Sequence, residues 1–565
     1  MSVTTLEKDL PRASVRAASE WRFAAIAMAL VLIVTSVPYA YAYLTTPPDK
    51  QFMGIMFDVP DHAQYFSWMR ELAQAPLASN KLTPEPNAPV FFNLLWWGLG
   101  QLGRLFGLGY APMFQIFRLA AGAAFGLVAY WLCAWFFEDR RMRRAAFLVA
   151  LLTSGFGWVL IALKYLLRLG DLPLQFILLA QIVEPNSFFG ILSTPHLVGS
   201  ALYVVSFVLI LKGEVRGQLR YAVAAGLFAL FIGWQHAYDL ILVYAILGSY
   251  GLLKWARDRR LPMYLFKSGL IVFVLSCSPA LYSVLLTSLD PMWKGVLAQY
   301  DNAGVFTPNL LLLPILMGPA FLLALFTTLK DNPVRLSGVD DKALFLRTWF
   351  WANFLLIYLP TNYQIKMLNG WQIPISLLAT RGLFEYVVPL AEKLFRERQW
   401  NWRADSLRRA GVITLVLMVL PTNLYLWTWR FVDLRRHDYP YYLHTDEISA
   451  LQWLEADGGP DDVVLSSLTI GQYVPALTGK RAFLAHWAQT LDFYGKSEMV
   501  DEFFAGGTSD ERRAQIIGQY GVKYVFYGPV EQRASGGFEP GASPMWVEVF
   551  ASPSVRVYTA KAGSE

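Results

Sequence analysis

The side chains best suited to chemistry in this sequence of 565 residues stand directly after a long apolar run. In FDVPDHAQYFSWMRE, Asp58 and Asp61 lie three residues apart, and Tyr65 follows four residues later. Pro60 suits the first position of a helix, so we predict that a helix begins there, with Asp61 in its first turn and Tyr65 on the same face. A carboxylate in this place can accept a proton or bind a cation, or it can merely complement the helix dipole.

More polar side chains stand where other apolar runs begin or end. In chain order they are Glu85 in TPEPNAP, Glu184 and His196 in EPNSFFGILSTPH, His236 and Asp239 in WQHAYD, and Lys366 in LPTNYQIKMLNG. Ionisable groups at membrane depth are costly and usually face a cavity or a partner. The alternatives are a structural ion-pair network and, for His196, a polar residue in the first turn of a helix.

Motifs of soluble enzymes do not compete with this interpretation. The sequence has no Walker loop, no GxGxxG after a strand, no HExxH and no CxxC. The acids and histidines above could bind a divalent cation, but no two of them have the spacing of a diagnostic metal site. We therefore expect no cofactor and assign no metal ligand, while a divalent metal stays possible in principle. Cys133 and Cys277 lie inside apolar runs and are interpreted as core thiols.

Composition places the chain among membrane proteins. Hydrophobic residues make up 55% of it and charged residues 16%, and apolar runs of about 20 residues recur. The net charge of +6 does not indicate nucleic-acid binding, because lysine and arginine mark the cytoplasmic loops of membrane proteins. We predict an α-helical polytopic membrane protein with about 11 transmembrane helices, at residues 22–44, 110–137, 145–163, 196–211, 220–235, 237–253, 264–287, 308–329, 345–360, 368–392 and 410–430.

The basic loops determine the predicted topology. As one helix, residues 220–253 would extend about 50 Å, well beyond a hydrocarbon core of about 30 Å, so we interpret them as two spans that turn at 234–236. The basic loops then fall on one side of the membrane with the amino terminus, and the carboxyl terminus falls on the other. The apolar segment 89–108 does not fit this alternation. We predict that it lies as a helix in the outer interface.

Three segments follow from this topology. Residues 1–21 form a cytoplasmic tail, residues 22–430 form the transmembrane domain with a large first external loop at about 45–109, and residues 431–565 are extracytoplasmic. Ala-Tyr-Ala at 40–42 resembles a signal-peptidase site, but the long apolar stretch favours an uncleaved anchor. We therefore place the protein in the plasma (inner) membrane, with several spans.

Residues 431–565 have the composition of an α/β domain. VVLSS, RAFLAH, VKYVFYG, WVEVF and VRVYTA predict strands of a partly parallel sheet. TDEISALQWLEA and TSDERRAQIIGQYG predict helices, with Thr445 as the N-cap of the first and Gly521 at the end of the second. His486 and Asp492 flank a strand end without a nucleophile at a telling spacing. We expect this domain to contribute no reacting group, and alanine at either residue to change turnover by less than about tenfold.

The order of parts resembles the GT-C superfamily of polytopic glycosyltransferases, and most closely relatives of the protein mannosyltransferase and lipid A aminoarabinose transferase families. In these families an acidic motif with a nearby tyrosine follows the first span. A proline-introduced interfacial helix, a glycine and an arginine-bearing second span come next. The corresponding parts here are Asp61 with Tyr65, residues 89–92, residues 107–109 and residues 118–120.

The resemblance covers residues 22–140 by motif and the remainder by architecture. It has one departure. The frequent Asp-Glu pair of the family is Asp61-His62 here, so a second acid, if one is needed, would be Asp58 or Glu85.

The resemblance implies an enzyme that moves a sugar from a polyprenyl-phosphate-linked donor to a lipid, glycan or protein acceptor on the extracytoplasmic side. A carboxylate must then deprotonate the acceptor hydroxyl beside an oxocarbenium-like anomeric carbon. The donor's lipid tail confines that carbon to the membrane surface, so Asp61 is the candidate base. Lys366, aided by His196 or His236, would bind the departing phosphate. The remaining candidate substrate-binding residues are Tyr65, Glu184 and Asp239.

Two other functions stay open at this point. A multi-pass transporter, or a lipid flippase or scramblase, would use intramembrane acids as relay or coupling sites. Against it, the predicted spans do not pair into two similar halves, and the polar groups gather on one side. The second alternative is an inactive scaffold that carries the external domain, which in the enzyme would position the acceptor.

Overall fold

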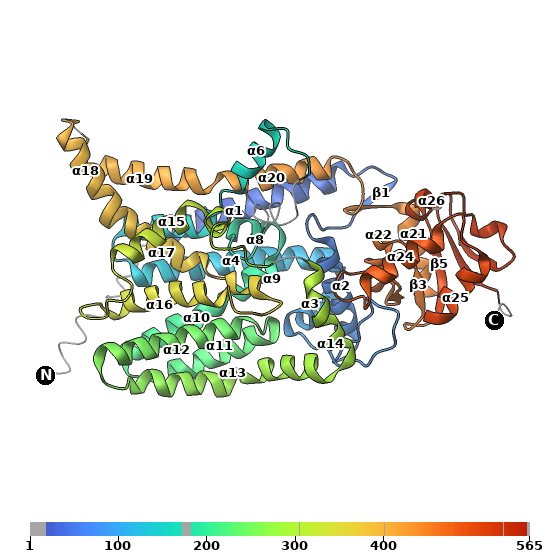
Figure 1. Cartoon of the computed structure of the whole chain (residues 1–565), viewed down its shortest axis with the longest axis horizontal. Helices are drawn as coiled ribbons and strands as arrows, with labels where there is room; N and C mark the ends of the chain where they lie inside the picture. Colours follow the sequence, from blue (N-terminus) through green and yellow to red (C-terminus); the bar gives the residue numbers. More distant parts are fainter. Residues whose placement is uncertain (1–17, 172–181, 304–305, 401, 535, 562–565) are drawn as a thin grey trace. The chain divides into compact units, whose positions relative to one another are not determined.

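The computed structural model describes residues 18–171, 182–303, 306–400, 402–534 and 536–561. These residues form two compact units, and Figure 1 labels their helices and strands along the chain. The helical unit contains the described parts of Met1–Val37, Phe117–Tyr282 and Gly304–Trp429. The mixed unit contains those of Pro38–Ile116, Ser283–Ala303 and Arg430–Glu565. The predicted first external loop and the carboxyl-terminal segment therefore belong to one unit.

Long apolar helices make up most of the helical unit. Those long and apolar enough to cross a membrane are α1 (Ala18–Thr45), α4 (Tyr110–Phe136), α9 with α10 (Pro195–Ser200 and Val204–Arg216), α12 (Asp239–Asp258), α13 (Met263–Leu289), α15 (Leu313–Lys330) and α17 with α18 (Gln372–Gly382 and Val388–Glu397). Two bent pairs are α5 with α6 (Arg140–Leu152 and Gly157–Leu166) and α19 with α20 (Ala404–Val419 and Pro421–Leu434). Within the described residues the number is thus 7, or up to 9 if each bent pair is one span.

Each of the predicted spans overlaps a helix. Residues 220–253 form two helices, α11 (Arg220–Gln235) and α12, as the basic loops predicted. α11 and α16 (Asp341–Leu356) are each 16 residues long, which is shorter than the roughly 20 residues of a typical span. The chain is therefore a polytopic helical protein, and the count of 11 spans stays a prediction.

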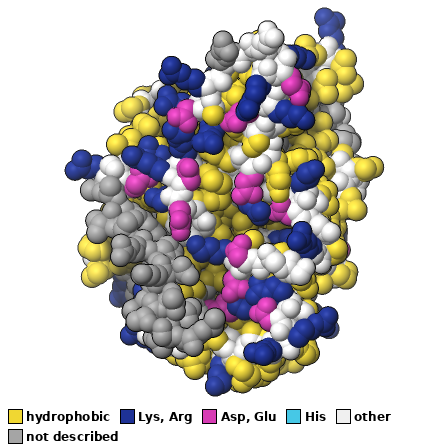
Figure 2. All heavy atoms as spheres, turned by 90° about the vertical axis from the view of Figure 1, so that its left-hand side faces the viewer, with side chains coloured by type: hydrophobic (Ala, Val, Ile, Leu, Met, Phe, Trp, Pro, Cys, Tyr) yellow, Lys and Arg dark blue, Asp and Glu magenta, His cyan; other side chains and the backbone are white. Residues whose placement is uncertain are grey.

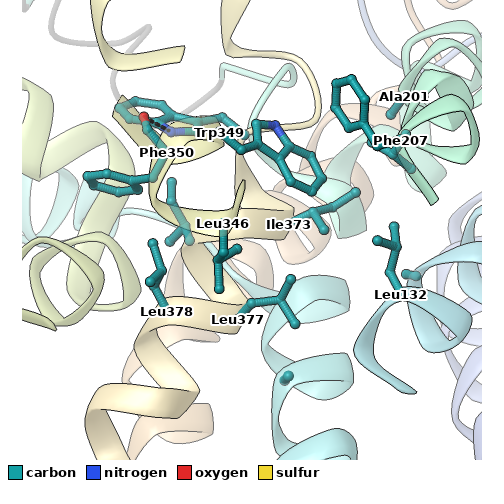
Figure 3. Packing of buried hydrophobic residues seen from close by; sticks show 14 of the residues in the cluster. Leu132, Ala201, Phe207, Leu346, Trp349, Phe350, Ile373, Leu377 and Leu378 are labelled. Carbon is teal, nitrogen blue, oxygen red and sulfur yellow. Dashed lines mark hydrogen bonds between the residues drawn. The ribbon is translucent and has the colours of Figure 1, made fainter. Parts of the chain in front are cut away.

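The core of the helical unit is rich in aromatic residues. Trp349 and Trp371 are fully buried, and the Trp371 indole N–H donates to the Phe350 carbonyl over 3.0 Å. Trp349 also meets Phe207 edge to face, with ring centroids 5.1 Å apart, in the cluster of Figure 3. On the outside, α13 exposes large apolar side chains such as Phe266, as a lipid-facing helix would.

Basic residues gather at one end of the helical unit, which is the end that faces the viewer in Figure 2. The ion pairs there include Arg144 with Glu20 over 2.7 Å, Arg141 with Asp405 over 2.5 Å, and Lys254 with Asp341 over 2.6 Å. These pairs join the starts of α1, α5, α16 and α19 with the end of α12. Basic loops that the sequence assigned to one side of the membrane therefore meet at one end. Their cytoplasmic orientation stays a prediction.

In the mixed unit, the first external loop forms two helices that pack on each other. α2 (Val59–Gln74) begins within one residue of the predicted start at Pro60, and α3 (Leu94–Phe106) occupies the predicted interfacial segment. A Cβ on Gly100 of α3 would lie 2.3 Å from the Met69 carbonyl oxygen of α2, so this close approach requires glycine. β1 (Lys50–Phe52) pairs antiparallel with β2 (Tyr442–His444), which ties the loop to the carboxyl-terminal segment.

Five strands form the sheet of the mixed unit. Their order is β4 (Arg481–Ala482), β3 (Val463–Leu465), β5 (Val522–Tyr527), β7 (Arg556–Ala560) and β6 (Trp546–Ala551). β3 is parallel to β4 and β5, whereas β7 is antiparallel to β5 and β6. All five predicted strands are present, and the predicted partly parallel sheet is confirmed. That residues 431–565 form a domain of their own stays a prediction.

The two helices predicted beside the sheet are also present, as α21 (Thr445–Ala456) and α25 (Asp510–Tyr520). Gly521 ends α25 at φ +61°, as predicted. The predicted N-cap of α21 is wrong. His444 precedes the helix instead, because Glu447 accepts the His444 backbone N–H over 2.7 Å. The other described short helices are α8 (Ser187–Ser193), α14 (Pro291–Ala298), α22 (Leu468–Gly471), α23 (Val474–Thr478), α24 (Phe493–Phe504), α26 (Pro529–Ala534), the 3₁₀ turns at Ala201–Tyr203, Gln299–Ala303, Gln364–Leu368 and Pro540–Ala542, and a π-helical turn at Leu383–Val387.

Candidate functional site

Asp61 lies in the first turn of α2, and the residues before it determine where that turn begins. Asp58 precedes the helix in the left-handed conformation, at φ +47°, which is uncommon for a residue with a side chain. Pro60 then occupies one of the first two helical positions, where no N–H is needed. The Asp58 carbonyl accepts the His62 backbone N–H over 3.2 Å, and the Asp58 side chain is exposed. This start directs Asp61 and Tyr65 to one face of α2.

His486 and Tyr65 both contact the Asp61 carboxylate. His486 Nε2 lies 2.9 Å from Asp61 Oδ1, and the Tyr65 hydroxyl donates to Oδ2 over 3.3 Å. His486 Nδ1 accepts the backbone N–H groups of Ala488, over 3.0 Å, and Gln489, over 3.2 Å. The ring hydrogen must therefore be on Nε2, which donates it to Asp61. We call Asp61, Tyr65 and His486 the Asp61 site.

Exposure distinguishes the members of the Asp61 site. The Asp61 side chain is 23% exposed, whereas that of His486 is 2% exposed, so the carboxylate is reachable and its partner is not. Tyr65 stacks on Trp96 with ring centroids 4.4 Å apart. Burial raises the pKa of Tyr65 well above its usual value, and the negative charge of Asp61 adds to the rise. Tyr65 therefore stays protonated and remains a donor to Asp61.

Glu85, the other candidate acid of the first external loop, is held by an ion pair. Its Oε1 lies 2.6 Å from Lys496 Nζ, and its Oε2 accepts the Thr83 hydroxyl. The Lys496 side chain is only 1% exposed, so removal of Glu85 would leave a buried cation without this partner. These contacts are sufficient to explain a carboxylate at position 85 structurally.

In the helical unit, Lys366 and Glu184 form a second ion pair. Lys366 Nζ lies 3.0 Å from Glu184 Oε1, and the two residues are 182 positions apart in the chain. Glu184 is 6% exposed and Lys366 is 31% exposed. The pair therefore joins a partly exposed lysine side chain to a buried carboxylate.

His236 and Asp239 belong to a buried network of the same unit. His236 Nδ1 lies 3.1 Å from Asp239 Oδ2, and the Asn369 amide donates to Asp239 Oδ1 over 3.2 Å and to the Ser200 hydroxyl over 2.7 Å. Asp239 is fully buried. We call these four residues the Asp239 network. Its contacts fix the end of the LPTNYQIKMLNG loop against the start of α12 and the end of α9.

His196 is connected to the residue before His236 by a hydrogen bond. Its carbonyl accepts the Gln235 amide over 2.9 Å, and the residue is half-buried at the start of α9. A Cβ on Gly370 would lie 2.4 Å from the Tyr203 hydroxyl, which itself donates to the Asn369 carbonyl over 3.0 Å. The backbone at 369–370 is thus tightly enclosed.

The structure therefore groups the predicted site residues by unit. Asp58, Asp61, Tyr65 and Glu85 belong to the mixed unit, whereas Glu184, His196, His236, Asp239 and Lys366 belong to the helical unit. Sequence reasoning missed the contact between His486 and Asp61. The available signal was that His486 is one of only 6 histidines and follows a strand of a parallel pair, where functional side chains often stand.

Among the residues that the structure describes, no three histidine, cysteine, aspartate or glutamate side chains group closely enough to hold a metal ion.

On the opposite face of α2 from Asp61, Phe66 and Arg70 line a cavity of about 950 Å³. There Arg70 pairs with Glu455 over 2.6 Å. The cavity is separate from the Asp61 carboxylate, because Asp61 does not line it.

Solved structures show what this fold is similar to. An oligosaccharyltransferase from Archaeoglobus fulgidus, in its apo form, matches with a TM-score of 0.54 and 14% identity over 98% of this chain and 76% of that one. The oligosaccharyltransferase AglB of that organism, in complex with an inhibitory peptide and a dolichol-phosphate, matches with a TM-score of 0.54 and 13% identity over 96% and 74%. At these identities the likeness shows that this chain shares the fold of these oligosaccharyltransferases, so the expected likeness to GT-C proteins is confirmed at the level of the fold.

ArnT from Cupriavidus metallidurans, solved bound to undecaprenyl phosphate, aligns over 97% of this chain and 99% of its own. Its identity is 14% and its TM-score is 0.48. No protein-family model and no curated protein matches the sequence. The Archaeoglobus enzyme has also been solved in complex with Zn and sulfate, with a TM-score of 0.50 to this chain.

Proposed function

We propose that this protein is a membrane glycosyltransferase, in which Asp61 acts as general base for the transfer of a sugar from a polyprenyl-phosphate donor to an acceptor hydroxyl. The observation that carries the proposal is the partly exposed Asp61 carboxylate, held by His486 and Tyr65 in the first turn after the first long helix. The GT-C fold supports the general kind of reaction. A transporter is not favoured, because the similar structures are glycosyltransferases.

The proposed step is a displacement at the anomeric carbon. The bond between that carbon and the donor phosphate oxygen breaks, and a bond to the acceptor oxygen forms. Asp61 takes the acceptor proton, and the lipid phosphate leaves as an anion. Positive charge develops on the sugar in the transition state, so an ionised carboxylate nearby is favourable as well as basic.

Lys366 is the proposed contact for the leaving phosphate. Its ammonium is partly exposed, and a charge-assisted hydrogen bond to phosphate is stronger than a neutral one. Glu184 orients this ammonium over 3.0 Å, and Asp239 accepts the Asn369 amide of the same loop. His196 and His236 stay candidates for the phosphate site. The AglB complex contains a dolichol-phosphate, which supports a lipid phosphate as the donor class.

The orientation that we propose places the amino terminus in the cytoplasm and residues 431–565 outside the plasma membrane, where they position a lipid, glycan or protein acceptor. The clustering of basic loops at one end of the helical unit supports it. A reporter fused after Glu565 should then face outside, together with a tag in the first external loop. A carboxyl terminus that is protected from protease in intact cells would contradict this orientation.

The test of the proposed base is transfer of a radiolabelled sugar from polyprenyl phosphate in vesicles. Asp61→Asn should lower transfer by about 10²–10⁴-fold, because the amide cannot take the proton. Donor affinity, measured separately, should change much less. Asp58→Asn, three residues away and exposed, is the matched variant. If Asp58→Asn or Glu85→Gln abolishes transfer while Asp61→Asn keeps it, the base is assigned to the wrong acid.

A further inference from the structure

The contact between Asp61 and His486 joins residues that are 425 positions apart. We propose that His486 is a positioning residue for the base: it holds Asp61 Oδ1 through a permanent hydrogen bond and does not itself relay the proton. This inference rests on the proposed function of Asp61. It assigns to the carboxyl-terminal segment a direct part in the site, beyond binding an acceptor.

The hydrogen bonds around the imidazole determine its role. Nδ1 receives two backbone N–H groups, from Ala488 and Gln489, so no hydrogen can be placed there without displacing both. Nε2 already carries the hydrogen that it donates to Asp61. A relay needs a nitrogen that can take up a proton and pass it on. In this arrangement the ring has none, so it is a fixed donor.

The backbone that carries His486 is fixed as well. Thr490 Oγ1 accepts the backbone N–H groups of Ala485, over 3.0 Å, and His486, over 3.1 Å. The Thr490 hydroxyl in turn donates to the Leu82 carbonyl over 2.5 Å. With the His486 side chain 2% exposed, the ring has little room to turn.

Residues 80–82 of the first external loop form three hydrogen bonds with residues 482–490, which carry His486. The Ala482 backbone N–H donates to the Lys81 carbonyl over 2.9 Å, the Asn80 amide donates to the Gln489 carbonyl over 2.8 Å, and Thr490 donates to Leu82. These bonds run from Asn80–Leu82 to the turn after β4. They hold His486 in register with the loop that follows α2. These hydrogen bonds therefore set the distance from Asp61 to His486.

The chemical consequence concerns the two carboxylate oxygens. The donor on Oδ1 restrains rotation of the carboxylate, and in the proposed step Oδ2 accepts the acceptor proton. Tyr65 approaches Oδ2 at 3.3 Å, a longer and weaker contact than the 2.9 Å bond of His486. In the step itself the acceptor O–H bond breaks, its hydrogen passes to Oδ2, and His486 keeps its own hydrogen throughout.

Two variants at position 486 and a control at position 492 separate positioning from relay. His486→Ala removes the donor and should lower the turnover of sugar transfer by about 10- to 100-fold, with donor affinity unchanged. This replaces the sequence-based expectation of less than about tenfold, which did not include the contact with Asp61. His486→Gln supplies an amide N–H of similar reach and should recover transfer to within several-fold of the wild type. A glutamine cannot relay a proton, so equal losses in the alanine and glutamine variants would overturn the proposal. Asp492→Ala, in the same segment, is the matched control and should stay within about tenfold.

The pH dependence of turnover gives a second readout that a purely structural role would not produce. If His486 only positions Asp61, the glutamine variant should keep the shape of the wild-type pH profile, because the titrating group is the same. Loss of one limb of the profile in His486→Gln would mean that the imidazole titrates in the reaction, which would overturn the proposal. Unfolding temperatures of all variants in detergent show whether a loss of transfer reflects loss of fold.

A double variant separates failure of this inference from failure of the proposed function. In an Asp61→Asn background, His486→Ala should cause little further loss, because the base that it positions is gone. If the two losses multiply instead, His486 acts independently of Asp61 and the inference fails. If Asp61→Asn alone keeps full transfer, the proposed function of Asp61 fails, whatever His486 does.

Discussion

The Asp61 site and the Asp239 network both join an aspartate to a histidine, but they do so in different ways. His236 and Asp239 are three residues apart across a helix start, so one short stretch of sequence brings them together. Asp61 and His486 are 425 positions apart, so only the tertiary fold does. Asp239 is fully buried, whereas Asp61 is 23% exposed. A carboxylate that substrates can reach is suited to catalysis, and a fully buried one that is bonded on both oxygens is suited to holding a loop.

The largest expected effect comes from changing each of the two aspartates to asparagine, which tests this comparison directly. Asp61→Asn should lower transfer by about 10²–10⁴-fold. It should leave the unfolding temperature nearly unchanged, because the amide N–H at this partly exposed position can face water or the Tyr65 hydroxyl oxygen, which can also accept. Asp239→Asn should do the reverse. One of its amide N–H groups would face a donor, which lowers the free energy of unfolding by about 1–3 kcal/mol. Sugar transfer per folded molecule and thermal unfolding in detergent are the two measurements. The assignment fails if Asp239→Asn abolishes transfer while the fold remains intact.

A buried acid of the mixed unit sharpens the comparison by showing what an inaccessible carboxylate does there. Glu447 is fully buried and accepts the Tyr439 hydroxyl over 2.7 Å, and burial raises its pKa from 4.5 to about 7. Between these values the folded protein holds a proton that the unfolded chain has released. Stability should therefore fall as the pH rises from about 4.5 to 7, by on the order of 3 kcal/mol.

Thermal unfolding between pH 5 and pH 8 measures this dependence. Glu447→Gln, which cannot ionise, should show less loss of stability than the wild type over that range. Glu498→Gln, at an exposed glutamate of the same unit, serves as the control and should follow the wild type. Equal pH slopes in the wild type and in Glu447→Gln would show that Glu447 does not titrate in this window.

A smaller effect tests whether the helical unit, which contains the Asp239 network, also contributes a contact to the donor phosphate. Lys366→Ala should weaken the affinity for a polyprenyl-phosphate sugar by roughly 10- to 100-fold, the usual size of a lost charge-assisted hydrogen bond. Turnover at saturating donor should change less. Lys294→Ala, at an exposed lysine of α14, controls for net charge. Donor affinity that is equal in the two variants would remove Lys366 from the phosphate site.

Local patterns explain why much of the fold could be predicted. The strands at 463–465, 522–527 and 556–560 have β-branched and aromatic residues in short runs, and the long helices have apolar runs of a length that only a membrane explains. The start of α2 followed from Pro60. By contrast, the N-cap of α21 was predicted at Thr445 and lies at His444, because a carboxylate three residues into the helix satisfies the His444 N–H.

The sequence by itself determined the helical membrane architecture, the basic loops that meet at one end, and the acid that stands directly after the first long helix. These features depend on residue types within a few turns of one another, and hydrophobic periodicity, charge and proline act at that range. The tertiary structure alone decided which residue holds Asp61 and which cation pairs with Glu85. His486 and Lys496 come from more than 400 residues away. No local pattern specifies the hydrogen bonds between residues 80–82 and 482–490 that hold His486 there, two of which the side chains of Asn80 and Thr490 donate.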